Sequence, residues 1–94
     1  MANPVVESFG YTNLSSSALV RTGKAQIGGI LCASSSSGTV KVWDNTSAAT
    51  TVVVNTMSLT AGQFYPIPAS VGTGIYVTIG GTADITVFWN PSQT

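Results

Sequence analysis

Charged side chains are scarce in this chain. Lys, Arg, Asp and Glu make up 6% of its 94 residues, three positive and three negative, so the net charge is zero. An ordinary soluble domain has about 25%. Three scattered cations make no basic face, so nucleic-acid binding is not expected. A free monomer with so little charge has little protection against association, so the composition favours a subunit of a larger assembly.

Histidine is absent and cysteine occurs once. Without His, the Ser-His and Cys-His nucleophile systems are unavailable, and we interpret Cys32 as a small buried hydrophobic side chain. Asp44 and Asp84 fall in predicted turns, where the Asp side chain commonly caps its own backbone. The alternative is a Ca²⁺ site shared with Asn45, but the spacing does not offer the six or more oxygen ligands that this ion takes. We expect no enzyme, no cofactor and no metal site.

A basic leader and a long apolar run are also missing. Residues 1–4 contain no basic residue, and the unbroken apolar runs are short. Neither a signal peptide nor a membrane-spanning helix is expected, and no membrane partner is implied.

Alternation of apolar and polar residues is the strongest pattern present. Residues 75–79 and 85–89 each alternate with period two, which is typical of a strand with one buried face. Gly80 and Gly81 lie between them and tolerate positive φ, so the pattern predicts a β-hairpin. Other expected strands are residues 18–20, 25–33, 39–43 and 51–59, with a turn at 34–38 and, because of its prolines, an edge segment at 63–68.

The predicted fold is all-β. About seven to eight short strands at turn spacings of about 8–12 residues favour a single-domain antiparallel β-sandwich, jelly-roll-like in type. Residues 25–94 are assigned to the sandwich domain. Residues 1–24 are assigned to an extended N-terminal arm with at most one short strand. An arm across a neighbouring subunit and a loosely ordered terminus both fit that segment.

Aromatic side chains supply the candidate binding surface. Tyr76 and Phe88 lie off the inward register of the predicted hairpin, and an exposed aromatic pair favours a covering sheet or subunit. Trp89 follows the buried register, whereas Trp43 fits either the core or an interface. The candidate partner or subunit-interface residues are Phe9, Tyr11, Trp43, Tyr65, Tyr76 and Phe88.

Between Ile27 and Trp89 the chain resembles the capsid decoration, or cement, proteins of tailed bacteriophages. The residues that carry the resemblance are Gly38-Thr39-Val40-Lys41-Val42-Trp43-Asp44, Leu59-Thr60-Ala61-Gly62-Gln63-Phe64-Tyr65-Pro66, Gly74-Ile75-Tyr76-Val77 and Gly80-Gly81-Thr82-Ala83-Asp84-Ile85-Thr86-Val87. Residues 1–24 carry none of it.

The resemblance implies a multi-copy structural protein of the virion, made in the host cytoplasm and bound to the outer capsid surface. Its partner would be the major capsid protein, whose neighbouring subunits it would bridge as a homo-oligomer, a trimer first and a dimer second. The N-terminal arm would be the clamp. The alternative function is a carbohydrate- or receptor-binding β-sandwich module of a tail or head fibre, in which an exposed Trp43 would stack on sugar rings.

Overall fold

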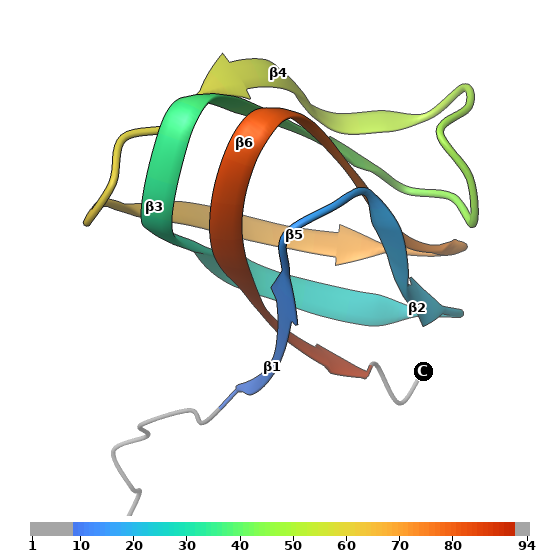
Figure 1. Cartoon of the computed structure of the whole chain (residues 1–94). Helices are drawn as coiled ribbons and strands as arrows, with labels where there is room; N and C mark the ends of the chain where they lie inside the picture. Colours follow the sequence, from blue (N-terminus) through green and yellow to red (C-terminus); the bar gives the residue numbers. More distant parts are fainter. Residues whose placement is uncertain (1–8, 92–94) are drawn as a thin grey trace, which may run out of the picture.

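The computed structural model describes residues 9–91, which form an all-β fold without a helix (Figure 1). Its strands are β1 (Gly10–Leu14), β2 (Ala18–Thr22), β3 (Ala25–Trp43), β4 (Val52–Ser58), β5 (Phe64–Val71) and β6 (Gly74–Pro91). All of them belong to one sheet, and every pairing is antiparallel. The prediction of an all-β, antiparallel fold is confirmed.

Two long strands form the centre of the sheet. β3 and β6 pair from Ala25 opposite Pro91 to Trp43 opposite Tyr76. β5 and β1 flank one end of this pair, and β4 and β2 flank the other. We call these the β1–β5 half, with strand order β1-β6-β3-β5, and the β2–β4 half, with order β2-β6-β3-β4.

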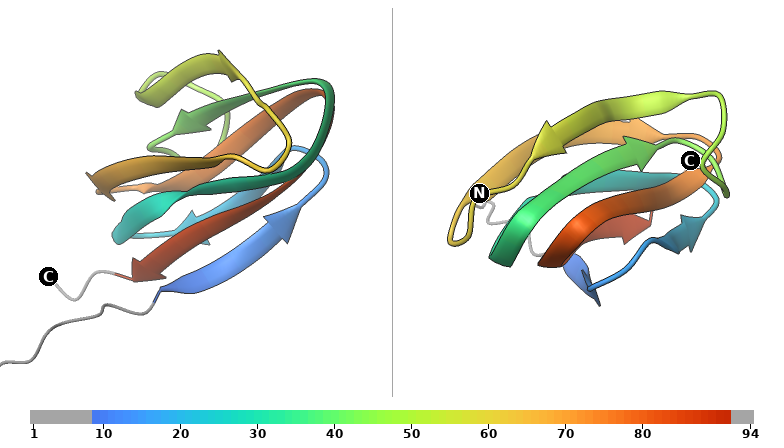
Figure 2. Two further views of the ribbon diagram at one scale, coloured as in Figure 1. Left: turned by 90° about the vertical axis from the view of Figure 1, so that its left-hand side faces the viewer. Right: turned by 45° about the horizontal axis from the view of Figure 1, so that its top comes forward.

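The sheet folds back on itself between the two halves, because β3 and β6 bend together (Figures 1 and 2). At the bend the register of the two strands shifts between Ser36 and Thr39. Gly81 has a φ of 68°, and a Cβ there would collide with the carbonyl oxygen of Ser37. A Cβ on Gly38 would lie 2.8 Å from that of Ala83. Glycine is needed at both positions for the strands to approach so closely.

The predicted hairpin over residues 75–89 is therefore wrong. β6 continues through Gly80 and Gly81 without reversing, and its two parts pair with β3 instead of with each other. The predicted turn at residues 34–38 is likewise part of β3. Each glycine-containing segment bends a strand instead of ending it, so residues 9–91 form six strands and not the seven or eight predicted.

Strands also occupy much of the predicted N-terminal arm. The expected strand at residues 18–20 lies within β2, but β1 is an additional strand. β1 was missed because it is short and contains a single deeply buried side chain, Leu14, opposite Ile85. Residues 1–8 of the predicted arm lie outside the described residues.

The core lies between the two halves and is formed mostly by the inward faces of β3 and β6, with Leu14, Leu59, Ile67 and Val71 added from other segments. Its most deeply buried large side chains are Ile30, Ile75, Ile85, Val40, Val42, Val77, Val87 and Cys32. Cys32 is fully buried, as predicted, and its thiol donates to the carbonyl oxygen of Ser34 at 3.3 Å. The prolines of β5 lie in an edge strand, as predicted, since β5 pairs only with β3.

Candidate functional site

The carboxylates do not form a reactive cluster. In the part of the chain that the structure describes, no group of three or more His, Cys, Asp or Glu residues could hold a metal ion. Asp84 lies at the bend and accepts a hydrogen bond from Asn13 Nδ2 at 2.7 Å. Asp44 follows the far end of β3, and the amide of Asn45 bonds its own loop at Ala49. The structure thus does not bring together the residues considered for Ca²⁺.

Asp44 binds the backbone of the β5–β6 connection. Its carboxylate oxygens accept hydrogen bonds from the N–H groups of Gly72 at 3.1 and 3.2 Å, Thr73 at 2.9 Å and Gly74 at 3.4 Å. Partial burial acts to raise the pKa of Asp44, but donation from Thr73, Gly72 and Gly74 outweighs it, so the pKa is lowered from its ordinary value of 3.8. This carboxylate has a structural role.

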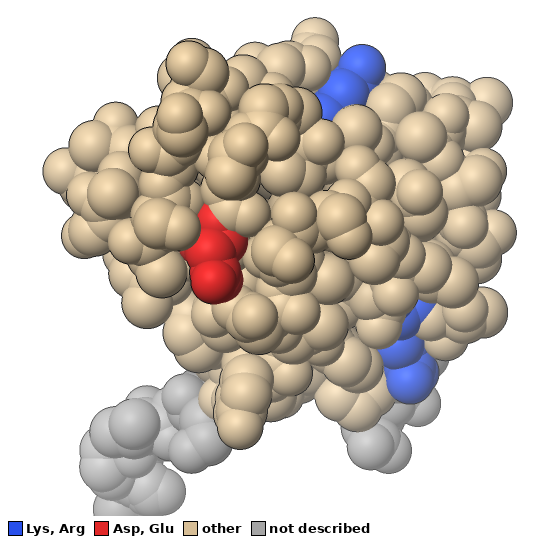
Figure 3. Space-filling view, in the orientation of Figure 1, with Lys and Arg blue, Asp and Glu red and all other residues tan. Residues whose placement is uncertain are grey.

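The surface is largely neutral. Figure 3 shows isolated acidic and basic patches separated by a broad uncharged surface. Because residues 9–91 show no charged or reactive cluster, the candidates for function are the two outer faces of the folded sheet. They point away from each other because the core lies between the halves (Figure 2).

The first candidate is the outer face of the β1–β5 half. Tyr11 lies opposite Phe88, and Leu31 lies opposite Phe64. Directly opposed residues of an antiparallel sheet share a face, and Phe88 follows the buried Val87, so these side chains point outward. The exposed fractions are 72% for Tyr11, 49% for Phe64 and 38% for Leu31. Such exposure of large apolar side chains on one face is typical of an interaction surface.

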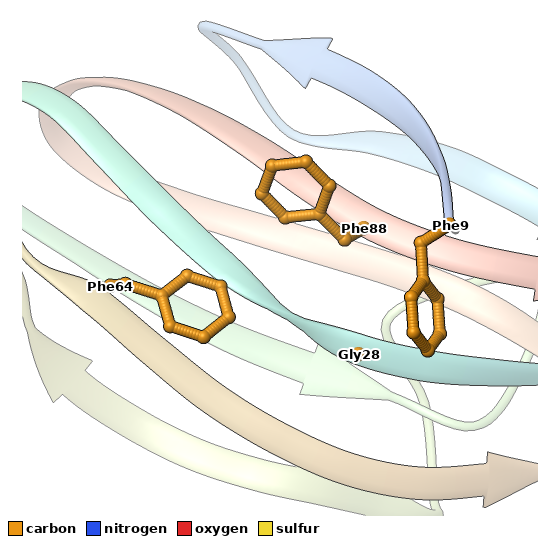
Figure 4. Close-up of a pocket in the computed structure, with 4 residues that line it drawn as sticks. All are labelled: Phe9, Gly28, Phe64 and Phe88. Carbon is orange, nitrogen blue, oxygen red and sulfur yellow. The ribbon is translucent and has the colours of Figure 1, made fainter. Parts of the chain in front are cut away.

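A hollow of about 460 Å³ opens on this face (Figure 4). It is lined by Phe9, Gly28, Phe64 and Phe88. The rings of Phe64 and Phe88 meet edge to face, with centroids 6.1 Å apart. The ring of Phe9 lies over Gly28, since a Cβ on that glycine would come within 3.1 Å of a ring atom. A side chain at Gly28 would press on this ring, so the glycine allows Phe9 to pack there as one wall of the hollow.

The second candidate is the outer face of the β2–β4 half. Leu19, Tyr76, Trp43 and Val52 lie opposite one another in a row across its four strands. Leu19 is 44% and Val52 40% exposed, while the two aromatic residues are half-buried. We call these four residues the transverse row.

The Trp43 ring is already engaged within this face. Its Nε1 donates to Thr78 Oγ1 at 3.0 Å. The ammonium of Lys41 lies 4.4 Å from the ring centroid, which places a cation over the ring. One face of the indole is therefore covered by a charged group of the same chain.

The predicted interface residues divide between these surfaces. Phe9, Tyr11 and Phe88 belong to the β1–β5 face, and Trp43 and Tyr76 belong to the transverse row. Tyr65 is set apart from both groups, because it packs against the core and its hydroxyl accepts the Thr60 N–H at 2.8 Å. Their role in binding a partner remains a prediction.

Sequence reasoning missed four residues of the two faces, namely Leu19, Leu31, Val52 and Phe64. For Phe64 the sequence did contain a signal that would have predicted its outward position. Ile67 and Val71 of β5 are buried, and Phe64, Pro66 and Pro68 are exposed. The period-two alternation of residues 64–71, if read through the prolines, would have placed Phe64 outward. Trp89 was predicted in the buried register, and it packs partly buried against the core with Nε1 bonded to Thr12 Oγ1 at 3.0 Å.

Comparison of the chain with protein-family models, with curated proteins and with solved structures finds no match in any of the three. Within residues 9–91, no helix has the length and apolar character needed to cross a membrane. The features that bear on function are therefore the outer faces of the β1–β5 and β2–β4 halves and the largely neutral surface.

Proposed function

We propose that the protein is a non-enzymatic structural component of a phage virion. It binds the outer surface of the capsid and stabilises the shell by bridging subunits of the major capsid protein. The observation that carries the proposal is the pair of apolar outer faces on opposite sides of one small β-rich body. The resemblance to capsid decoration proteins supplies the partner and the location.

A bridging protein needs at least two contact surfaces on one rigid body. The β1–β5 face and the transverse row provide them, since each exposes large apolar side chains. Burial of apolar surface contributes about 2.5 kcal/mol per 100 Å² before the costs of association are subtracted. Pressure from the packaged genome would then have to break these contacts in addition to the contacts of the shell itself.

We further propose that the folded-back sheet is a small jelly-roll-like β-sandwich, in which each half of the sheet forms one layer. Because β3 and β6 run through both halves, a load applied to one outer face is transmitted to the other through continuous backbone. This suits a subunit that is loaded from two sides.

The test is the copy number of the chain in purified phage particles, measured by quantitative mass spectrometry against the major capsid protein. A copy number comparable to that of the shell protein is expected. A ratio of a few per cent or less would contradict capsid decoration and would favour a tail or fibre component.

The carbohydrate-binding alternative depends on a free Trp43 ring. Lys41 lies over that ring, and the indole N–H of Trp43 donates a hydrogen bond to Thr78. Stacking on a sugar through the covered side would first have to displace the ammonium group, which weakens this alternative relative to the structural one.

A further inference from the structure

We propose that the outer face of the β1–β5 half is a contact between two copies of this chain, packed face to face about a two-fold axis. This inference concerns the isolated protein and does not depend on the proposed virion role. In a particle, the contact between copies would take the place of a capsid contact at the β1–β5 face, and the dimer would bridge subunits through its two transverse rows.

The face carries a protruding side chain next to a hollow. Tyr11 is 72% exposed, the highest value among the large hydrophobic residues that are exposed. It lies opposite Phe88, which lines the hollow over Gly28. Because the protrusion and the hollow belong to one face, a two-fold axis in the contact plane lets Tyr11 of each copy enter the hollow of the other. In such an isologous contact both copies use the same surface, so the assembly stops at two chains and both hollows are filled.

The chemistry of the hollow suits a tyrosine ring. Its walls are the rings of Phe9, Phe64 and Phe88. Aromatic rings gain from edge-to-face contacts beyond the area that they bury. A tyrosine ring entering from above would add such contacts to the existing pair of Phe64 and Phe88.

The scarcity of charge on this face points to a second copy as the occupant. The polar side chains that alternate outward here are neutral, among them Asn13, Gln26, Thr86 and Ser70. Asp84, the one charged residue of β6, is already bonded to Asn13. A partner of ordinary composition would bury charges here without a counter-charge, which is costly. A second copy of the same face brings only its own Asp84, which is bonded to Asn13 at the bend in the same way.

The size of the face sets the expected strength of the contact. Four strands about 4.8 Å apart, with β5 about 26 Å long, give a projected face of about 500 Å². A standard interface buries about 800 Å² of accessible surface on each partner, and a ridged face exposes more area than its projection. The contact is therefore at the lower end of the range for specific dimers, and a dimer that dissociates on dilution is expected.

The experiment is sedimentation equilibrium of the purified chain over a wide range of concentrations. A monomer–dimer equilibrium is expected, and Tyr11→Ser is expected to raise its dissociation constant at least tenfold. The matched control is Leu19→Ser, which removes an exposed large side chain from another short edge strand on the opposite face. It should leave the dissociation constant unchanged. Far-UV circular dichroism and urea unfolding establish that each variant is folded.

A second variant protects the test against misfolding of the first. Leu31→Lys places a charge on the same face at a position that is 38% exposed, and it should abolish the dimer. A wild-type chain that stays monomeric, a trimer in place of a dimer, or equal weakening by Leu19→Ser and Tyr11→Ser would each overturn the proposal. Copy number in particles is a separate measurement, so failure of the virion role and failure of this contact are distinguishable.

Discussion

Asp44 joins segments that are far apart in the chain. It follows β3, and it binds the N–H groups of Gly72, Thr73 and Gly74. Turn chemistry predicted that its side chain would cap its own backbone, whereas it binds the backbone of a segment far away in the sequence. The partner was not predictable, because it comes from a connection 28 to 30 residues further along the chain.

Asp44→Asn is expected to lower the free energy of unfolding by about 1 kcal/mol at neutral pH. The amide offers one acceptor oxygen in place of two and loses the charge-assisted character of the bonds, and partial exposure limits the effect. Urea unfolding of the two proteins measures the difference.

The same pair of proteins should differ in pH dependence. Because the pKa of Asp44 is lowered in the folded state, the carboxylate contributes fully above its ordinary pKa of 3.8. That contribution is lost as the pH falls from 3.8 through the folded-state pKa. The stability difference between wild type and Asp44→Asn should therefore shrink below about pH 4. A difference that stays constant from neutral to strongly acidic pH would show that the ionised carboxylate is not responsible.

At the scale of elements, β6 shows why glycine pairs are ambiguous in strand sequences. Gly80-Gly81 permits a reversal, and it also permits a sharp bend in a strand that keeps its partner. The choice depends on whether a second long strand is available to pair on both sides of the bend. β3 provides that strand. The sequence of residues 74–91 alone contains no signal for this pairing.

Gly81→Ala is expected to destabilise the protein by more than about 2 kcal/mol, because the residue has positive φ and its Cβ would meet the carbonyl oxygen of Ser37. Gly72→Ala is the control. A Cβ there meets nothing within 4 Å, and alanine keeps the N–H that Asp44 binds. Its effect should stay within about 0.5 kcal/mol. Equal losses for the two variants in urea unfolding would contradict this account of the bend.

Alternation alone predicted most strand positions, including β4 and the buried faces of β3 and β6. It could not give the pairing, since the partner of each strand lies far away in the sequence. The outward positions of Tyr76 and Phe88 followed from period two. The hollow did not, because it needs Phe9, Gly28 and Phe64 from three separate segments to meet Phe88.

At the scale of the whole molecule, the shared long strands make the two halves one cooperative unit. Trp43 lies in the β2–β4 half and Trp89 in the β1–β5 half. Neither half has a complete sheet without β3 and β6. Loss of packing in one half therefore removes the support for the same strands in the other.

Single-tryptophan variants test this cooperativity. Trp43→Phe leaves Trp89 as the reporter, and Trp89→Phe leaves Trp43. In each variant, urea unfolding followed by tryptophan fluorescence and by far-UV circular dichroism should give the same midpoint. If fluorescence in either variant changes at a clearly lower urea concentration than circular dichroism, the halves unfold separately.

The central place of β6 has a consequence for synthesis on the ribosome. β6 is the last strand of the described chain to be translated, yet β1, β2 and β3 all pair with it. Until β6 leaves the exit tunnel, β1 and β2 have no strand partner at all. β1 and β2 therefore stay unpaired until then, whereas β3 already has β4 and β5 as partners. Emergence of β6 from the exit tunnel, more than any earlier event in translation, sets when this domain can fold.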